Sequence, residues 1–116
     1  LADQCRRRHK RAGQLQSKGR YMAAQLHAML DDDIWLENGR AANRAARIVA
    51  EAAPERLLDQ VDANEVFMRL SAAERESLRS QGFAFYDWSD TSARFVTAWN
   101  TSAEDADALA KALAAL

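Results

Sequence analysis

The chain has 116 residues and a formal net charge of −1, which leaves room for one small domain. Its hydrophobic content of 48% is typical of globular chains, but 25 alanines stand against 22 residues of Leu, Ile, Val and Phe. A low content of large aliphatic side chains indicates disorder only when the net charge is also high, so we expect a folded unit with a thin core. Such a unit should depend on further packing partners, because small domains bury a lower fraction of their surface.

Several classes of protein are disfavoured at this stage. No apolar run approaches the roughly 18 residues that a bilayer span requires, and no secretory signal pattern is present. The single cysteine, Cys5, excludes an internal disulfide framework, and with His9 and His27 it has no spacing typical of a zinc site. We therefore expect no metal site and a reduced thiol in a cytoplasmic protein. The first residue, Leu1, predicts that the sequence begins inside a longer chain.

Basic residues are concentrated at the start of the chain. Residues 1–20 hold seven of the sixteen basic residues and one acid, Asp3. A cluster such as Arg6–Arg11 is typical of nucleic-acid-binding arms, because Lys and Arg release counterions from phosphates, but interleaved aromatic residues for base stacking are missing. We favour a basic surface that meets the acidic remainder of the chain or a partner subunit. A site for a small phosphate-bearing cofactor is the third interpretation.

Two helices are predicted in the first half. Between Lys18 and Leu30, apolar residues recur at i, i+4, i+7 and i+8, which predicts an amphipathic helix. Asp31–Asp33 interrupts this helix and favours a new helix start, because Asp side chains accept hydrogen bonds from free backbone N–H groups. This long second helix should run to about Ala53, before Pro54. The apolar face of the first helix carries Met22, Leu26, Met29 and Leu30.

The second half has the two-residue alternation of strands. Residues 66–70 predict a strand, and Ser71 and Glu74 then form a capping-box pair that opens a short helix closed by Gly82. Residues 83–86 and 93–99 predict two further strands joined by a turn, and a last helix should begin near Thr101. The predicted fold class is therefore α+β, a small antiparallel or mixed sheet of about three strands, covered by helices and preceded by two helices.

Arg94 is the candidate site residue of this sheet. Alternation places it on the same face as Val96 and Ala98. If that face is apolar, the guanidinium requires an anionic partner, whereas at the rim of the sheet it would keep its charged end in water. The residues leave both alternatives open. Three aromatic residues are expected in the core or at an interface: Trp35, Trp88 and Trp99.

Three stretches resemble the C-terminal part of low-specificity L-threonine aldolases, which are pyridoxal 5'-phosphate (PLP) enzymes with the aspartate aminotransferase fold (fold type I). They are the basic, Gly-containing stretch His9–Leu15, the Asn-centred strand Asp62–Met68, and Ala93–Asp105, a strand followed by a capped last helix. The resemblance implies that residues 1–33 are the end of the large PLP domain with a connecting helix. Residues 34–116 are then the C-terminal small domain with its long linking helix.

The resemblance also implies an activity. The family cleaves the Cα–Cβ bond of L-threonine or related β-hydroxy-α-amino acids to glycine and an aldehyde, and PLP acts as the electron sink. Arg94 matches the family's anchor for the substrate carboxylate, a role suited to the planar guanidinium fork. Lys10 aligns with a basic position near the cofactor. Some members of the family place an arginine near the cofactor phosphate, and the aligned position here is Ser17, with Lys18 next to it. Either lysine could serve the site of a neighbouring subunit. A homodimer or homotetramer acting on an amino-acid substrate is implied.

The chain also departs from the family pattern. Only Lys10, Lys18 and Lys111 are present, and none lies in the sequence context of the family's cofactor lysine. We therefore expect no catalytic residue in this segment, an inactive isolated chain, and the remainder of the parent enzyme as its partner. The alternatives are a PLP-dependent β-eliminating lyase or a phenylserine-type aldolase of the same fold. The alternative from another class is a basic-arm nucleic-acid-binding protein.

Overall fold

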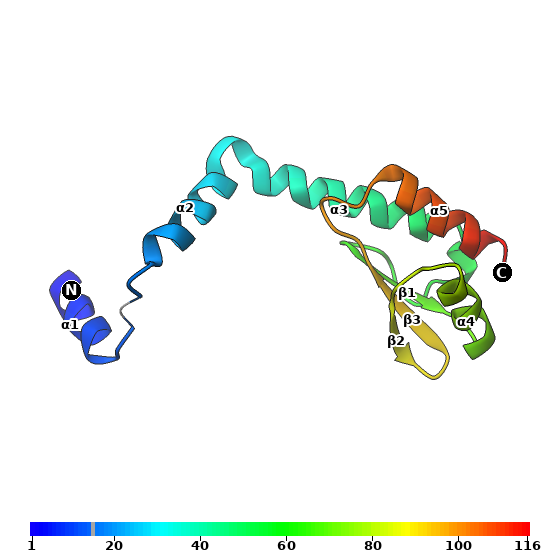
Figure 1. The fold of residues 1–116 in the computed structure, drawn as a ribbon, viewed down its shortest axis with the longest axis horizontal. Helices are drawn as coiled ribbons and strands as arrows, with labels where there is room; N and C mark the ends of the chain where they lie inside the picture. The colour runs from blue at the N-terminus through cyan, green and yellow to red at the C-terminus, as the bar shows by residue number, and fades with distance from the viewer. Residues whose placement is uncertain (15) are drawn as a thin grey trace. The chain divides into compact units, whose positions relative to one another are not determined.

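The computed structural model describes residues 1–14 and 16–116 and has the predicted α+β fold (Figure 1). Leu15, the last residue of the His9–Leu15 stretch, lies outside the described residues. The chain divides into two compact units, residues 1–34 and residues 35–116. The helices in the described residues are α1 (Ala2–Arg11), α2 (Gly19–Leu30), α3 (Ile34–Glu51), α4 (Ala72–Ser80) and α5 (Ala103–Ala114), and the strands are β1 (Glu65–Arg69), β2 (Tyr86–Ser89) and β3 (Ser92–Val96).

The first unit contains α1 and α2 and has no core of its own. None of the described residues in 1–34 is buried. Helix α2 confirms the predicted amphipathic helix, but its apolar face is open to solvent. The sequence patterns did not predict α1, because this strongly basic segment has no apolar period.

A short turn separates α2 from α3. The acidic run was predicted to interrupt the first helix and to be followed by a long second helix; Asp31–Asp33 forms a 3₁₀ turn, and α3 follows directly from Ile34. Asp32 and Asp33 have φ angles of 51° and 56°, in the left-handed region that a right-handed helix cannot continue through. Asp tolerates that region better than most residues, because its short side chain can hydrogen-bond locally. The acidic run therefore interrupts the helical path between α2 and α3, and the long helix follows it as predicted.

The sheet is antiparallel, with strand order β1-β3-β2. Asp90 and Thr91 form the turn between β2 and β3, within the predicted turn segment. The predicted strand at 83–86 is wrong, because Phe83 and Phe85 pack against the core from the loop before β2. All residues of β2 are exposed, so this strand carries no apolar signal.

Helices α3, α4 and α5 cover one face of the sheet, and the core lies between them. Figure 1 shows α3 and α5 side by side above the strands. The contribution of α3 is mostly alanine, whereas β1 supplies the larger side chains. The fully buried large residues are Met68, Leu70, Leu78, Leu113, Val49 and Val66.

The predicted capping box at the start of α4 is confirmed. The Ser71 hydroxyl accepts a hydrogen bond from the backbone N–H of Glu74, and the Glu74 carboxylate accepts one from the backbone N–H of Ser71 at 2.7 Å. The backbone and side chain of Ser71, together with Arg56, lower the pKa of Glu74 from 4.5 to about 2. Arg56 Nη1 donates to Glu74 Oε1 at 2.8 Å, so the charged carboxylate joins the segment after α3 to α4.

Candidate functional site

The candidate site lies on the face of the sheet opposite the helices, with Arg94 at its centre. In the strand register, Arg94 of β3 is paired with Phe67 of β1 on one side and with Tyr86 of β2 on the other. Directly opposed residues of antiparallel strands point to the same face of a sheet. The neighbours of Arg94 in β3, Ala93 and Phe95, point to the buried face. The guanidinium is therefore on the outer face of the domain.

Aromatic rings surround the Arg94 side chain. Its Cζ lies 4.9 Å from the centre of the Tyr86 ring and 5.7 Å from that of Trp88. Phe67 and Trp88 are in edge-to-face contact, with ring centres 5.0 Å apart. A cation at this distance from an aromatic face is attracted by the ring quadrupole. The rings thus hold the guanidinium in place without using its hydrogen-bond donors.

The hydrogen-bonding capacity of Arg94 is largely uncommitted. Its contact with a carboxylate is the ion pair between Nη1 and Glu65 Oε1, which is 3.8 Å long and therefore beyond hydrogen-bond distance. Nε is buried and has no hydrogen-bond partner among the described residues. The side chain as a whole remains 28% exposed, so the ends of its fork are reachable. A buried cationic donor without a partner favours the binding of an anion.

The end of β3 is attached to the rest of the domain by polar contacts. The buried Thr97 donates through Oγ1 to the carbonyl oxygen of Ala42 in α3, at 2.7 Å. Asn64 Nδ2 donates to the carbonyl oxygen of Thr97 at 2.7 Å, and the N–H of Thr97 donates to Asn64 O at 3.0 Å. These bonds hold the strand that carries Arg94 against both β1 and α3.

A buried arginine holds the hairpin that supplies the aromatic rings. Arg75 of α4 donates to the carbonyl oxygens of Ser89 at 2.6 Å, Asp90 at 2.8 Å and Ser92 at 3.2 Å. It is one of the few charged residues in the interior of the described chain. Because β2 pairs with β3 alone, these bonds fix the turn and with it the strand of Tyr86 and Trp88. Sequence patterns did not identify Arg75, since it lies within an otherwise ordinary helix.

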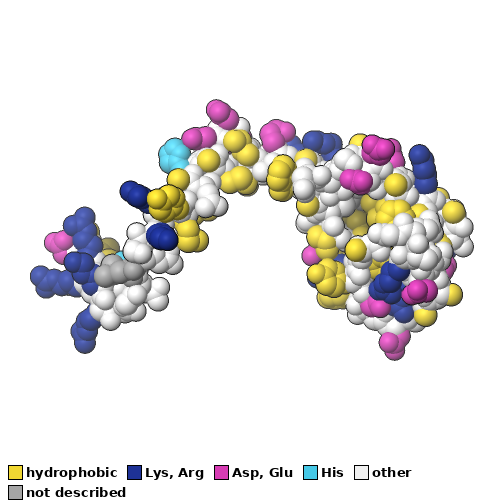
Figure 2. Space-filling view, viewed as in Figure 1, with side chains coloured by type: hydrophobic (Ala, Val, Ile, Leu, Met, Phe, Trp, Pro, Cys, Tyr) yellow, Lys and Arg dark blue, Asp and Glu magenta, His cyan; other side chains and the backbone are white. Residues whose placement is uncertain are grey.

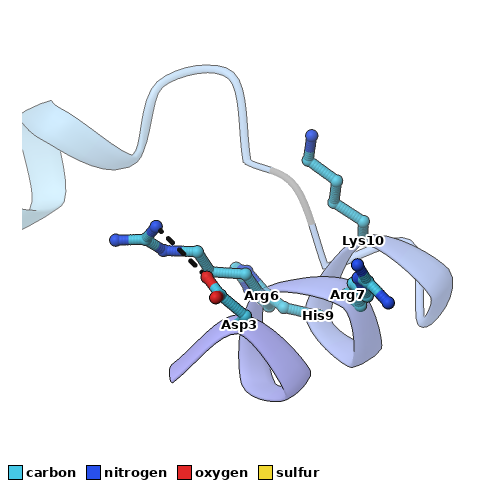
Figure 3. Close-up of a pocket in the computed structure, with 5 residues that line it drawn as sticks. All are labelled: Asp3, Arg6, Arg7, His9 and Lys10. Atoms are coloured by element: carbon cyan, nitrogen blue, oxygen red, sulfur yellow. Dashed lines mark ion pairs between the residues drawn. The ribbon is translucent and has the colours of Figure 1, made fainter. Parts of the chain in front are cut away.

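The two lysines predicted at the cofactor, Lys10 and Lys18, lie in the first unit, whereas Arg94 lies in the second. Both are exposed, Lys10 on α1 and Lys18 immediately before α2, and neither forms an ion pair with any described residue. Lys10 lines a surface hollow of about 560 Å³ together with Asp3, Arg6, Arg7 and His9. Figure 3 shows the 3.8 Å ion pair between Asp3 and Arg6, with Lys10 extending in another direction.

Two expectations about individual residues need correction. Of the two places expected for Trp35, Trp88 and Trp99, the core of the described domain is wrong, since all three are exposed, and an interface stays a prediction. Trp88 instead contacts Arg94, a role that only the pairing of β2 with β3 reveals. Ala98 lies beyond the end of β3, so the shared face includes Val96 but not Ala98.

Two kinds of feature were also looked for among the described residues, a metal site and a membrane-spanning helix. They contain no cluster of three or more His, Cys, Asp or Glu side chains able to hold a metal ion. No helix in the described part of the chain combines the length and the apolar character needed to cross a membrane. The fold and the arginine-centred face together define an α+β domain with a partly exposed guanidinium among aromatic rings.

Two known proteins that resemble this chain are low specificity L-threonine aldolases. The chain is 40% identical to the low specificity L-threonine aldolase of Pseudomonas aeruginosa over 116 aligned residues, which cover 96% of this chain and 34% of that enzyme. It is 37% identical to the low specificity L-threonine aldolase of a Pseudomonas sp. over 106 residues, 87% of this chain and 31% of that enzyme. No protein-family profile matches the chain. The chain thus corresponds to a segment of these aldolases and spans about one third of their length.

Proposed function

We propose that this chain is the substrate-anchoring part of a PLP-dependent aldolase that cleaves the Cα–Cβ bond of L-threonine or a related β-hydroxy-α-amino acid. The products would be glycine and an aldehyde. The similarity to two low specificity L-threonine aldolases supports the reaction, and the geometry of Arg94 supports the role of this segment. In the division of the enzyme that we propose, residues 1–33 are the end of the large domain and residues 34–116 form the small domain.

The observation that carries the proposal is the uncommitted guanidinium of Arg94. Its buried Nε has no partner in the described chain, and the 3.8 Å contact with Glu65 is too long to occupy the fork. A substrate carboxylate could accept two parallel N–H bonds from this group, which would fix both its position and its orientation. A fixed carboxylate lets the enzyme hold the Cα–Cβ bond perpendicular to the cofactor ring, the orientation in which that bond is cleaved.

The cofactor would be bound mainly by residues outside this chain. When bound, PLP supplies the electron sink that stabilises the charge left on Cα. Lys10 and Lys18 are exposed cations without a carboxylate partner in the described residues, and such point charges suit the cofactor phosphate. The described segment offers no catalytic group of its own in the proposed enzyme.

A hybrid enzyme tests the proposal. This chain would replace the matching third of the P. aeruginosa aldolase, and threonine cleavage would be followed through acetaldehyde and glycine. In the hybrid, Arg94→Ala should raise the KM for threonine at least about tenfold, because a charge-assisted hydrogen bond contributes roughly 1.5–3 kcal/mol. Arg94→Lys should recover only part of this loss, since an ammonium cannot make the bidentate pair.

The matched control is Arg69→Ala, which removes an exposed arginine from β1 of the same sheet. Its KM should stay within about twofold of the unaltered hybrid, as expected for a solvated side chain outside the site. An unchanged KM in Arg94→Ala would contradict the proposed role of Arg94. If the hybrid released ammonia and a keto acid in place of glycine, the reaction would instead be β-elimination.

The isolated chain should be inactive. Incubated with glycine, acetaldehyde and PLP, it should form no β-hydroxy-α-amino acid above the rate without protein. Turnover by the 116 residues alone would contradict the proposal that the cofactor site lies mainly elsewhere. We also propose that the complete enzyme is a cytoplasmic homo-oligomer, and the exposed, unpaired Cys5 fits a reducing compartment.

A further inference from the structure

Trp88 is the extra residue of a bulge in β2. The pairs on either side of it join Asp87 to Ala93 and Ser89 to Ser92. Two consecutive residues of β3 therefore face three residues of β2, and Trp88 is left without a partner in the register. A β-bulge can re-aim a side chain, and bulges are over-represented next to active sites. The bulge therefore points to a function for the Trp88 side chain.

The ring of Trp88 reaches across the central strand of the sheet. β1 and β2 are both neighbours of β3 and not of each other, so their backbones lie about 10 Å apart. Even so, the rings of Phe67 in β1 and Trp88 in β2 are in edge-to-face contact, with an angle of 67° between their planes. The two rings therefore meet over β3, the strand that carries Arg94.

Core packing does not account for Tyr86 and Trp88. The two residues are 65% and 58% exposed, and neither belongs to the cluster of buried side chains. Figure 2 shows hydrophobic side chains gathered on the surface of the second unit beside the strands. Aromatic side chains stabilise a domain mainly through the area that they bury, which is small here. Both rings instead contact the Arg94 guanidinium, with ring centres 4.9 and 5.7 Å from Cζ.

The two rings restrict the Arg94 guanidinium and leave its donors free, because a cation over a ring face is attracted without using an N–H group. Bidentate binding of a carboxylate requires the guanidinium fork to stay within about 10–20° of the productive orientation. We propose, resting on the proposed function, that Trp88 and Tyr86 are positioning residues, which hold the Arg94 fork in the orientation that receives the substrate carboxylate. Phe67 supports Trp88 in turn through the contact over β3.

NMR of the Arg94 Nε–H group tests the contact in the 116-residue chain. This nitrogen is buried, so its hydrogen should exchange slowly with water. Trp88→Leu keeps an apolar side chain but removes the ring, and it should speed this exchange at least about fivefold, because the released guanidinium moves into water. Trp88→Phe keeps a ring and should stay within about twofold of the unaltered chain.

The matched control for this measurement is Trp99→Leu. It removes another exposed ring, which has no contact with Arg94 among the described residues, and it should leave the exchange of the Nε–H group unchanged. Tyr86→Leu repeats the test from the second ring and replaces Trp88→Leu if that variant does not fold. Unchanged exchange on removal of either ring would overturn the proposal.

A double-mutant cycle in the hybrid enzyme separates positioning from a merely structural role. Trp88→Leu should raise the KM for threonine about three- to tenfold, and Trp88→Phe should recover most of this loss. In the Arg94→Ala hybrid, Trp88→Leu should change the KM by less than about twofold, because Trp88 acts through Arg94. An equal rise in both backgrounds would overturn the proposal, since the ring would then act independently of Arg94.

The two experiments separate this proposal from the proposed function. Exchange of the Arg94 Nε–H group that depends on the rings, with no threonine cleavage by the hybrid, would support the positioning of Arg94 and contradict the proposed function. An active hybrid whose KM for threonine depends on Arg94, but not on Trp88 or Tyr86, would support the proposed function and overturn the positioning role.

Discussion

Arg75→Met should strongly destabilise the second unit. The guanidinium donates to three carbonyl oxygens of the β2–β3 hairpin, at 2.6, 2.8 and 3.2 Å, and the side chain is buried. Methionine is long enough to preserve much of the packing but has no donor, so the substitution removes mainly the hydrogen bonds.

The expected loss follows from these contacts. Hydrogen bonds from a charged donor contribute roughly 1.5–3 kcal/mol each to stability, and bonds that share one donor group are not additive. The carbonyls of the exposed turn regain water in the variant, which reduces the cost further. We expect the free energy of unfolding to fall by about 3–5 kcal/mol, a large part of the total for a small domain.

Urea denaturation of the isolated chain, followed by tryptophan fluorescence, measures this loss because Trp88 lies in β2. The matched control is Arg79→Met, which removes an exposed guanidinium that pairs with Asp87 at 2.7 Å. An exposed pair contributes less than about 1 kcal/mol, so this variant should be close to the unaltered chain. If Arg75→Met cost no more than Arg79→Met, the hairpin would not depend on Arg75 and our account of how β2 is held would be refuted.

Three further predictions concern other polar contacts. Glu74→Gln should lower the free energy of unfolding by about 2–3 kcal/mol at pH 7. Because the pKa of Glu74 in the folded chain is about 2, the difference in stability between the two proteins should shrink as the pH falls from about 4.5 to 2. A difference that urea titrations find independent of pH would exclude the ionised capping box as its source. Thr97→Val should lower the free energy of unfolding, measured by thermal unfolding, by about 1–2 kcal/mol, because it removes the hydrogen bond to Ala42 without changing the shape of the side chain. An unchanged free energy of unfolding would mean that this bond is dispensable. Ser102→Ala should lower the free energy of unfolding by about 1 kcal/mol and speed the hydrogen exchange of the first amides of α5, because it removes the N-terminal cap of this helix. Unchanged hydrogen exchange would argue against the cap.

Locally determined features were predictable from sequence. The capping box of Ser71 and Glu74 depends on residues three apart in the sequence. Pro54 prevents α3 from continuing, because its ring clashes with the preceding turn of a helix and its nitrogen has no hydrogen to donate. The positions of α4, β1 and α5 followed from such signals combined with the apolar period. The left-handed conformation of Asp32 was not predictable, because Asp is common both at helix starts and in the left-handed region.

The surroundings of Arg94 were only partly predictable. Alternation along β3 correctly grouped Arg94 with Val96, but it could not say which face meets the helices. The ring contacts depend on the pairing of β3 with both other strands, and this pairing is set by tertiary structure. A bulge between Asp87 and Ser89 further shifts the register near Trp88, and no sequence pattern in β2 signals it.

The alanine-rich composition has a different meaning in each unit. In α3, Ala46 and Ala50 face the sheet, and small side chains let a helix approach its neighbour closely, so that the larger residues of β1 can fill the space. The core of the second unit is thus formed between its own helices and strands. In α2 the large residues Leu26 and Leu30 are on the surface, although they would be the most stabilising if buried. Scarcity of large aliphatic residues therefore does not prevent the second unit from forming a core, whereas the described large residues of the first unit are not buried. Truncation to residues 35–116 should consequently preserve the cooperative unfolding of the chain, and a substantially lower melting temperature after truncation would show that α1 and α2 stabilise the second unit.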